Sequence, residues 1–377
     1  MKSSNDKVIP IILRFSSNVR LLILLLSLTV FVFSCSKTDN ITGDIEGNYS
    51  LVLDTLRVES NNYLASTAMR LSQIKNDTLF YFDDQQSKLM SIDLIKNEFI
   101  NASPITRAEP NGIGNNLWRL DLSTDNKFIF TSLNEATFFD ENGEFIKSKT
   151  LLDENYLKKI GKDYINITTH CTLADNDQYY CIYDSLQYRN KGFIKFNLRN
   201  EEFEITPLKN LSSYNRFDLP KMKFRPLIQS YNGKILFSHP GTNELLIWDV
   251  KEGKYEHKAF QSTLTKNSLS FEGVNPENVL ELLKSVRSQV HFLKLLYDKE
   301  RNEYIRLSIA PLNAENKADE NSIVVTVFDK DFNQKTELET RLYDNADNHL
   351  FHNGKIYIPQ YYPDENIYFL TIEVQQH

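Results

Sequence analysis

The sequence predicts an all-β fold: a single six-bladed β-propeller, closed by an N-terminal strand and carrying one helical insertion between blades. Three observations predict it. A unit of about fifty residues recurs six times, the last unit stops one strand short, and aromatic residues are abundant. The chain has 24 Phe, 19 Tyr and 2 Trp, whose flat side chains pack well on pleated strands.

Each unit begins with an apolar strand, a tight polar turn and a second apolar strand. The turns contain residue types that tolerate the backbone angles of tight hairpins. They are Asn76-Asp77, Asp125-Asn126, Asp175-Asn176-Asp177, Asn232-Gly233, Lys299 to Asn302 and Asn353-Gly354. The strands that follow them start 49, 51, 56, 69 and 52 residues apart, a spacing typical of four-stranded propeller blades.

The second half of the unit also repeats. Five strands end in an apolar residue followed by Asp or Asn, whose side chain can cap the backbone of a polar turn. These pairs are Ile92-Asp93, Phe139-Asp140, Phe196-Asn197, Trp248-Asp249 and Phe328-Asp329.

The two ends of the repeat region complement each other. Tyr49 to Leu56 is an orphan strand with alternating apolar residues, and the chain's last strand is Ile367 to Val374. Pairing them would close the ring and cover both strand edges. A two-sheet sandwich or separate small β domains is the structural alternative, but neither explains the orphan strand.

One helix is expected, in the connection 257 to 291. Asn275-Pro276 supplies a cap and a first-turn proline before the helical stretch Glu277 to Val286.

Cys171 and Cys181 each lie five residues from Asn176, so a hairpin centred there would place them directly opposite each other. Two alternatives stay open. An oxidising compartment would permit a cross-strand disulfide. Two small buried thiols are the favoured interpretation, because an ordinary strand pair often fails the strict geometry of a disulfide.

The N-terminus has the charge and hydropathy order of a secretory signal. Lys2, Lys7, Arg14 and Arg20 precede the apolar or small-residue run Leu21 to Ser34. This uncharged run of 14 residues is short against the ~20 that a membrane-spanning helix needs. Residues 1–34 are therefore predicted to be a signal peptide and are excluded from fold reasoning.

The run ends in Val32-Phe33-Ser34-Cys35, which resembles the lipobox of bacterial lipoproteins. By that resemblance, Cys35 receives a diacylglycerol thioether and further acyl chains, such as palmitate, which anchor the protein to a membrane. An ordinary cysteine is the alternative. Residues 35–48 are polar and are expected to form a flexible tether, and residues 49–377 the propeller.

Charge and motifs exclude several functions. Without residues 1–34 the chain has 39 Lys and Arg against 49 Asp and Glu, a formal charge of −10, which argues against binding nucleic acid. The seven histidines form no local metal-binding motif. Gly112-Ile113-Gly114 is not followed by the lysine and helix of a phosphate loop, so we expect a tight turn there. We therefore expect the protein to bind neither a metal ion nor another cofactor.

Three features carry a resemblance to a known family. They are the lipobox at Cys35, the loop Glu109-Pro110-Asn111-Gly112-Ile113-Gly114, and Tyr297-Asp298-Lys299 followed by Tyr304-Ile305-Arg306. Together they resemble an uncharacterised family of TolB-like six-bladed β-propeller lipoproteins of Bacteroides-type bacteria, over nearly all of the mature chain. The resemblance implies a protein of the cell envelope that is lipid-anchored to the outer membrane, with the propeller on either the periplasmic or the cell-surface side. It supplies no catalytic residues.

Long connections are expected to gather on one face of the propeller, and long loops on a rigid scaffold usually carry function. These connections are residues 101–117, 148–166, 205–225, 257–291 and 308–321. The candidate ligand-binding residues on this face or near the channel are Arg107, Glu109, Asn111, His170, Arg225, His239, Tyr361 and Tyr362. Any one of them alone is more often a solvated or structural residue than a ligand contact.

Two functions remain open. The favoured one is a binding or scaffold module that presents its loop-rich face to an envelope protein or a glycan. The alternative is an enzyme that acts on an extracellular carbohydrate or peptide at the channel mouth, through residues such as His170, Arg225 and His239.

Overall fold

Tight turns with left-handed backbone angles organise the chain into hairpins. Asn76 and Asp77 have φ angles of 47° and 62°, and Asn232 and Gly233 have φ angles of 50° and 71°. Two successive positive φ angles match the twist of the flanking strands, which is why Asn, Asp and Gly occupy these positions. Asn353-Gly354 forms the same kind of turn, with φ angles of 46° and 75°.

The computed structural model describes residues 48–59, 69, 71–108, 111–114, 117–132, 135–151, 165–174, 178–185, 191–198, 202–208, 211, 214, 217, 224, 226–311, 321–342, 348–360 and 366–377, with no side-chain description at residues 165–170, 184, 185, 191, 311, 321 and 342. The predicted signal peptide, Cys35, the tether up to Gly47 and the turn Asp175-Asn176-Asp177 lie outside these ranges.

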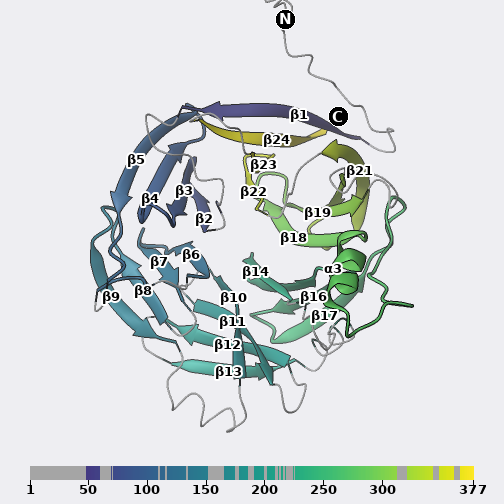
Figure 1. Ribbon diagram of the computed structural model, residues 1–377, viewed down its shortest axis with the longest axis horizontal. Coiled ribbons are helices and arrows are strands. Elements are labelled where there is room, and N and C mark those ends of the chain that lie inside the picture. Colours follow the sequence, from purple (N-terminus) through teal and green to yellow (C-terminus); the bar gives the residue numbers. More distant parts are fainter. Residues whose placement is uncertain are drawn as a thin grey trace, which may run out of the picture. The chain divides into compact units, whose positions relative to one another are not determined.

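The strands form six antiparallel four-stranded sheets arranged as blades around a ring (Figure 1). The first three blades are β2 (Ser72–Lys75), β3 (Thr78–Asp83), β4 (Lys88–Asp93) and β5 (Glu98–Pro104); β6 (Arg119–Leu122), β7 (Phe128–Thr131), β8 (Glu135–Phe139) and β9 (Phe145–Thr150); and β10 (Ile165–Leu173), β11 (Gln178–Ser185), β12 (Lys191–Asn197) and β13 (Phe203–Pro207).

The other three blades are β14 (Leu227–Tyr231), β15 (Lys234–His239), β16 (Thr242–Asp249) and β17 (Lys254–Ala259); β18 (His291–Asp298), β19 (Glu303–Pro311), β20 (Asn321–Phe328) and β21 (Gln334–Leu342); and β22 (Leu350–His352), β23 (Lys355–Gln360) and β24 (Ile367–Gln376) with β1 (Tyr49–Val58). The six-bladed propeller is therefore confirmed.

Aspartate caps explain why the outer hairpins turn where they do. The Oδ1 atom of Asp93 accepts hydrogen bonds from the backbone N–H groups of Ile95 and Lys96, both at 2.9 Å. Asp140, Asp249 and Asp329 each accept two backbone N–H groups in the same way. The predicted capping role is confirmed at these four turns, because a short carboxylate satisfies the N–H groups that the turn leaves unpaired.

The N-terminal strand closes the ring. β1 pairs with β24 along its whole length, from Tyr49 opposite Gln376 to Val58 opposite Ile367. In Figure 1 both strands lie side by side, although they come from opposite ends of the chain. The predicted closure is confirmed, and the β1 strand extends two residues beyond the expected Leu56.

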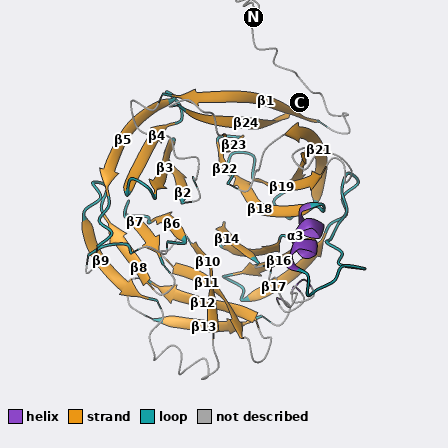
Figure 2. Ribbon diagram, viewed as in Figure 1, coloured by secondary structure: helices purple, strands orange, loops and turns teal. Residues whose placement is uncertain are grey.

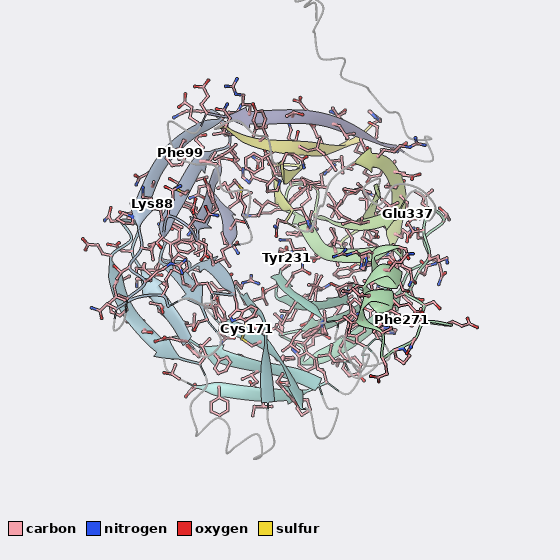
Figure 3. The ribbon with its side chains drawn as sticks, viewed as in Figure 1. Lys88, Phe99, Cys171, Tyr231, Phe271 and Glu337 are labelled. Atoms are coloured by element: carbon pink, nitrogen blue, oxygen red, sulfur yellow. A yellow bond between two sulfur atoms is a disulfide. The ribbon has the colours of Figure 1, made fainter. Side chains whose placement is uncertain are left out.

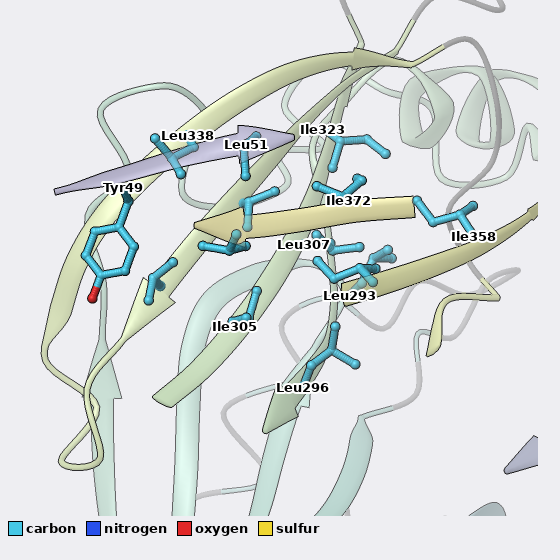
Figure 4. Close-up of a cluster of buried hydrophobic side chains, with 14 of the residues drawn as sticks. Tyr49, Leu51, Leu293, Leu296, Ile305, Leu307, Ile323, Leu338, Ile358 and Ile372 are labelled. Atoms are coloured by element: carbon cyan, nitrogen blue, oxygen red, sulfur yellow. The ribbon is translucent and has the colours of Figure 1, made fainter. Parts of the chain in front are cut away.

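Apolar side chains fill the space between neighbouring blades. Around the closure, Tyr49 and Leu51 of β1 pack with residues of the last two blades, such as Ile305, Ile323 and Ile372 (Figure 4). Five further buried clusters surround the ring at the other blade interfaces. Each blade is thus held by apolar contacts with its neighbours on both sides.

The single described helix, α3 (Val279–Arg287), lies between β17 and β18 on the outside of the ring (Figure 2). It begins two residues later than the predicted Glu277 and its N-cap is Asn278, whose side chain accepts a hydrogen bond from the Glu281 backbone N–H. Asn275 instead forms a turn with the N–H of Glu277. The expected cap at Asn275 was wrong, because both asparagines can cap a helix and only one is followed by helical backbone.

Cys171 of β10 lies opposite Cys181 of β11, as the predicted hairpin requires. The structure joins their sulfur atoms in a disulfide, with the two Cα atoms 4.0 Å apart. Both residues are buried among apolar side chains, which hides the bond from solvent.

We expect the closing strand to contribute strongly to stability. Leu51→Ala should lower the free energy of unfolding by about 2 to 3 kcal/mol, because it leaves a cavity between β1 and the last two blades. Thr55→Ala, at an exposed position of the same strand, should change it by less than about 0.5 kcal/mol. Urea unfolding measures both, and equal losses in the two variants would contradict a packed closure.

The disulfide is tested by counting thiols. Alkylation of the denatured, unreduced protein followed by peptide mass spectrometry should find Cys171 and Cys181 unmodified until a reductant is added. Alkylation of both residues before reduction would show two free thiols instead.

Candidate functional site

The first strand of each blade lines the central channel of the ring. Neighbouring inner strands contact each other around most of the ring, as β14 does with β10 and β18. They enclose a cavity of about 1010 Å³ whose lining includes residues of all six blades. In Figure 3, Tyr231 of β14 lies close to the middle of the ring. Central channels and barrel mouths are common places for ligands, because a rigid wall holds side chains from many strands in fixed positions.

Arg119 and Asp121 form an ion pair on the channel side of β6. They are two residues apart on one strand, so both side chains point to the same face. The Nε atom of Arg119 donates to both carboxylate oxygens of Asp121, each at 2.7 Å. Arg119 Nη1 also donates to the carbonyl of Cys171 on the next blade. The charge of Arg119 is therefore compensated within the protein.

The carboxylate of Asp121 is 3% exposed and has further partners. The hydroxyl of Tyr179 donates to it, and the Gln73 side chain approaches it at 3.4 Å. Burial raises the pKa of Tyr179 well above its usual value, and the nearby Asp121 charge raises it further. Burial opposes the charge of Arg119, but Asp121 reverses this effect and raises the pKa of Arg119.

Lys294 of β18 is different, because the structure gives its ammonium no hydrogen bond or ion pair with any described residue. Burial lowers the pKa of Lys294 to about 8, and repulsion by Arg119 contributes to this shift. At neutral pH most of the lysine is still charged. The cavity wall thus holds a cation that the described part of the protein does not neutralise.

The neighbouring strand β14 fixes the backbone beside Lys294. The side-chain amide of Gln229 donates to the carbonyl of Leu295 at 2.5 Å, and the hydroxyl of Tyr231 donates to the same carbonyl at 3.3 Å. Burial raises the pKa of Tyr231 to about 12, so its hydroxyl is neutral at physiological pH. These bonds hold β14 and β18 in register across two blades.

The described charges that line the cavity are Lys75, Arg119, Lys294 and Asp121, a balance of three cations and one anion. Lys75 donates to the Ser123 carbonyl at 3.1 Å and to Asn126. The whole chain carries a formal charge of −7. A positive channel in an acidic protein favours the entry of anionic groups.

Of the residues predicted from the sequence, Arg107 has a structural role. Its guanidinium donates to Ser87 at 2.8 Å and pairs with Asp84 in the β3–β4 turn, and it lies 5.4 Å from the centre of the Phe82 ring. The next loop is wider than the predicted tight turn, because the N–H groups of Ile113 and Gly114 donate to the carbonyls of Thr106 and Arg107, seven residues earlier. Asn111 is exposed in this loop and does not line the cavity.

His239 is also structural. It is 0% exposed and lies between the rings of Tyr214 and Phe217, whose centres are 5.0 and 4.8 Å away. Its Nδ1 accepts a hydrogen bond from the Gly241 N–H at 3.0 Å, which shapes the β15–β16 turn. His239 therefore does not reach the cavity.

The remaining predicted residues cannot be placed as site residues. Glu109, Arg225, Tyr361 and Tyr362 lie outside the described residues, and of His170 only the backbone in β10 is described. The channel residues Arg119, Asp121 and Lys294 were not among the sequence-based candidates. A signal for them existed, since a charged residue in the first strand of a predicted blade faces either a neighbouring blade or the channel.

Two further features concern metal binding and membrane-spanning helices. Within the described ranges, no three His, Cys, Asp or Glu residues gather to hold a metal ion. None of the described helices is long and apolar enough to cross a membrane.

The depressed pKa of Lys294 gives stability a distinct pH dependence. Because its pKa is lower in the folded state, the folded protein binds fewer protons between pH 8 and 10.5, and the free energy of unfolding rises with pH in that window. Lys294→Met should be more stable than wild type by about 1 to 3 kcal/mol at pH 7, and this difference should shrink towards pH 10.

Denaturant unfolding between pH 7 and 10 measures this difference. Lys254→Met is the control, because the Lys254 side chain is 79% exposed and should have little effect at any pH. A pH-independent difference between wild type and Lys294→Met would contradict a half-buried, charged lysine with a lowered pKa.

The fold has solved counterparts. A DUF4221-family protein from Bacteroides vulgatus superposes with a TM-score of 0.63 and 15% identity, over 88% of this chain and 100% of that chain. A Bacteroides fragilis protein described as exported gives a TM-score of 0.53 and 10% identity, over 87% of this chain and 95% of the other. At these identities the likeness shows the fold alone.

Among curated proteins, none matches this chain. The sequence profile of the domain of unknown function DUF4221 matches residues 47–339, which cover most of the propeller. The chain therefore belongs to the DUF4221 family.

Proposed function

We propose that the protein is an exported, lipid-anchored binding module, without catalytic activity, that takes up a glycan or part of an envelope protein at its channel. The observation that carries this proposal is the cavity of about 1010 Å³, whose wall combines fixed polar groups with Lys294, which has no partner among the described residues. A volume of this order is typical of sites for small molecules and for the ends of larger ligands.

The sequence supports the location. The basic leader, the apolar run Leu21 to Ser34 and Cys35 have the order of a lipoprotein signal. The similar Bacteroides fragilis protein is described as exported, which agrees with this order. In the proposed arrangement, acyl chains on Cys35 hold the protein on the outer membrane, and the tether lets the propeller reach its ligand.

The topology supports access from the loop-rich face. In each antiparallel blade, the short turns within hairpins lie at one end of the strands, and the connections between blades lie at the other end. The connection 260–290 between β17 and β18 therefore begins and ends at one mouth of the channel, the end at which β6 begins. Trp118, which is 41% exposed and lines the cavity, directly precedes β6 at this mouth.

The enzyme alternative has less support. Its candidate His239 is enclosed by aromatic rings and accepts a backbone hydrogen bond, so it is not placed to exchange protons with a substrate in the channel.

The binding role is tested in intact cells. The protein with a tag after His377 is crosslinked gently, purified from solubilised membranes and analysed by mass spectrometry, and its purified form is applied to an array of immobilised glycans. We expect one partner protein in stoichiometric amount or one class of glycan. Failure of both screens would contradict a binding module.

A Cys35→Ser variant is the matched control. It should lose its acyl chains and its membrane retention, yet keep the same partner or glycan in solution. Retention of the variant in the membrane fraction would contradict the proposed anchor while leaving the binding role intact.

A further inference from the structure

Lys294, a channel cation without a partner in the part of the chain that the structure describes, indicates the chemistry of the ligand. We infer that the channel binds a carboxylate group, with the ammonium of Lys294 as its main charged contact. The inference rests on the proposed binding function and specifies the class of ligand.

Charge balance is the first argument. Removing an ammonium from water costs several kcal/mol unless a counter-charge or hydrogen bonds replace the water. Arg119 has both, from Asp121 and the Cys171 carbonyl. Lys294 has neither among the described residues, and it lines an open cavity into which an anion can move. A bound carboxylate would supply the missing partner.

Arg306 is a fully buried cation and serves as a comparison for the half-buried Lys294. Arg306 of β19 is 0% exposed, and its guanidinium lies 5.1 to 5.8 Å from the ring centres of Phe260, Phe292 and Phe328. Its three nitrogen atoms also have no hydrogen-bond partner among the described residues, but aromatic faces surround it and it does not line the described cavity. Lys294 differs because its surroundings leave room for a ligand.

The excess of positive charge on the cavity wall argues for an acidic ligand. Among the described lining residues, Asp121 is held by Arg119, and Lys75 is bonded at the far end of the channel to Ser123 and Asn126. With three cations and one anion, the four described charged side chains of the wall carry a net charge of +2. Lys294 is the cation that has no hydrogen bond or ion pair with a described residue, so a carboxylate would be its counter-charge. A cationic ligand would be repelled by Lys294 and Arg119 together.

Other side chains that line the cavity would contact the part of the ligand beyond its carboxylate. Trp118 and Tyr297 offer flat apolar faces, and Ser72, Gln73 and Ser230 offer hydroxyl and amide groups within the same cavity. A ligand with a carboxylate on a body that is partly polar and partly flat would use both. A uronic acid of a glycan and the C-terminus of a peptide are two sources of such a carboxylate.

Binding should depend on pH through Lys294. The pKa of Lys294 in the protein without ligand is about 8, so its affinity for a carboxylate should fall as the pH rises above 8 and the ammonium loses its proton. The other titratable groups that line the cavity are Lys75, Arg119, Asp121, Tyr231 and Tyr297. The pKa of Tyr231 is about 12, so its hydroxyl stays neutral over this range.

Calorimetric titration of the detergent-solubilised full chain at pH 7 tests the inference. The probes are digalacturonic acid and N-acetyl-triglycine with a free carboxylate, each paired with a neutral analogue, the methyl ester or the amide. We expect one acid to bind at least about tenfold more tightly than its neutral analogue, since a hydrogen bond to a charged group contributes about 1.5 to 3 kcal/mol. The acid that binds identifies the source of the carboxylate.

Three variants separate the charge of Lys294 from general effects. Lys294→Met should weaken binding of the acid about tenfold or more and remove its fall above pH 8. Lys294→Arg should retain most of the affinity but not the pH dependence, and Lys254→Met should behave as wild type.

Unchanged binding in Lys294→Met, equal binding of acid and neutral analogue, or no binding of either acid would overturn the inference. These results would leave the proposed function intact if crosslinking or the glycan array still identifies a ligand. Failure of those two screens would instead count against the binding module itself.

Discussion

Backbone pairing between the two ends of the chain is the interaction on which the propeller depends. Ten residue pairs join β1 to β24, and apolar residues of β1 pack into the interface of the last two blades. Without β1, the sixth blade would have three strands and an exposed edge. Because each inner strand touches mainly its neighbours, a gap at one blade would loosen the whole wall of the channel. Ring closure therefore holds the cavity in shape.

Arg119 and Lys294, two of the three described cations in the channel wall, have different surroundings. Asp121 and the Cys171 carbonyl accept hydrogen bonds from Arg119, and the Tyr179 hydroxyl donates to Asp121, so this ion pair fixes β6 against β10. Lys294 is left without a described partner beside the same space. The described cavity wall therefore contains one ion pair with its own hydrogen-bond partners and, beside it, a lysine without a described partner. This excess of positive charge favours anions over cations in the cavity.

Local features of the sequence were sufficient for the architecture. Turn residues such as Asn76-Asp77 and Asn232-Gly233 have left-handed backbone angles that few other residues adopt, and Asp93 or Asp329 caps a turn only a few residues away. These interactions act within one hairpin, so a single stretch of sequence contains both partners. The cap of α3 was the exception, because Asn275 and Asn278 satisfy the same local rule and only the path of the chain distinguishes them.

By itself the sequence determined the strand repeat, the turns, the closing strand and the pairing of Cys171 with Cys181 on neighbouring strands. Only the tertiary structure decided which polar residues meet. His239 and Arg107 fit a loop-face site in sequence, yet aromatic stacking buries the first and Asp84 holds the second. Arg119 and Lys294 are 175 positions apart in the chain, and they influence each other because ring closure brings β6 and β18 to one cavity. Charge and burial at a site made by six blades are properties of the ring, which no single repeat contains.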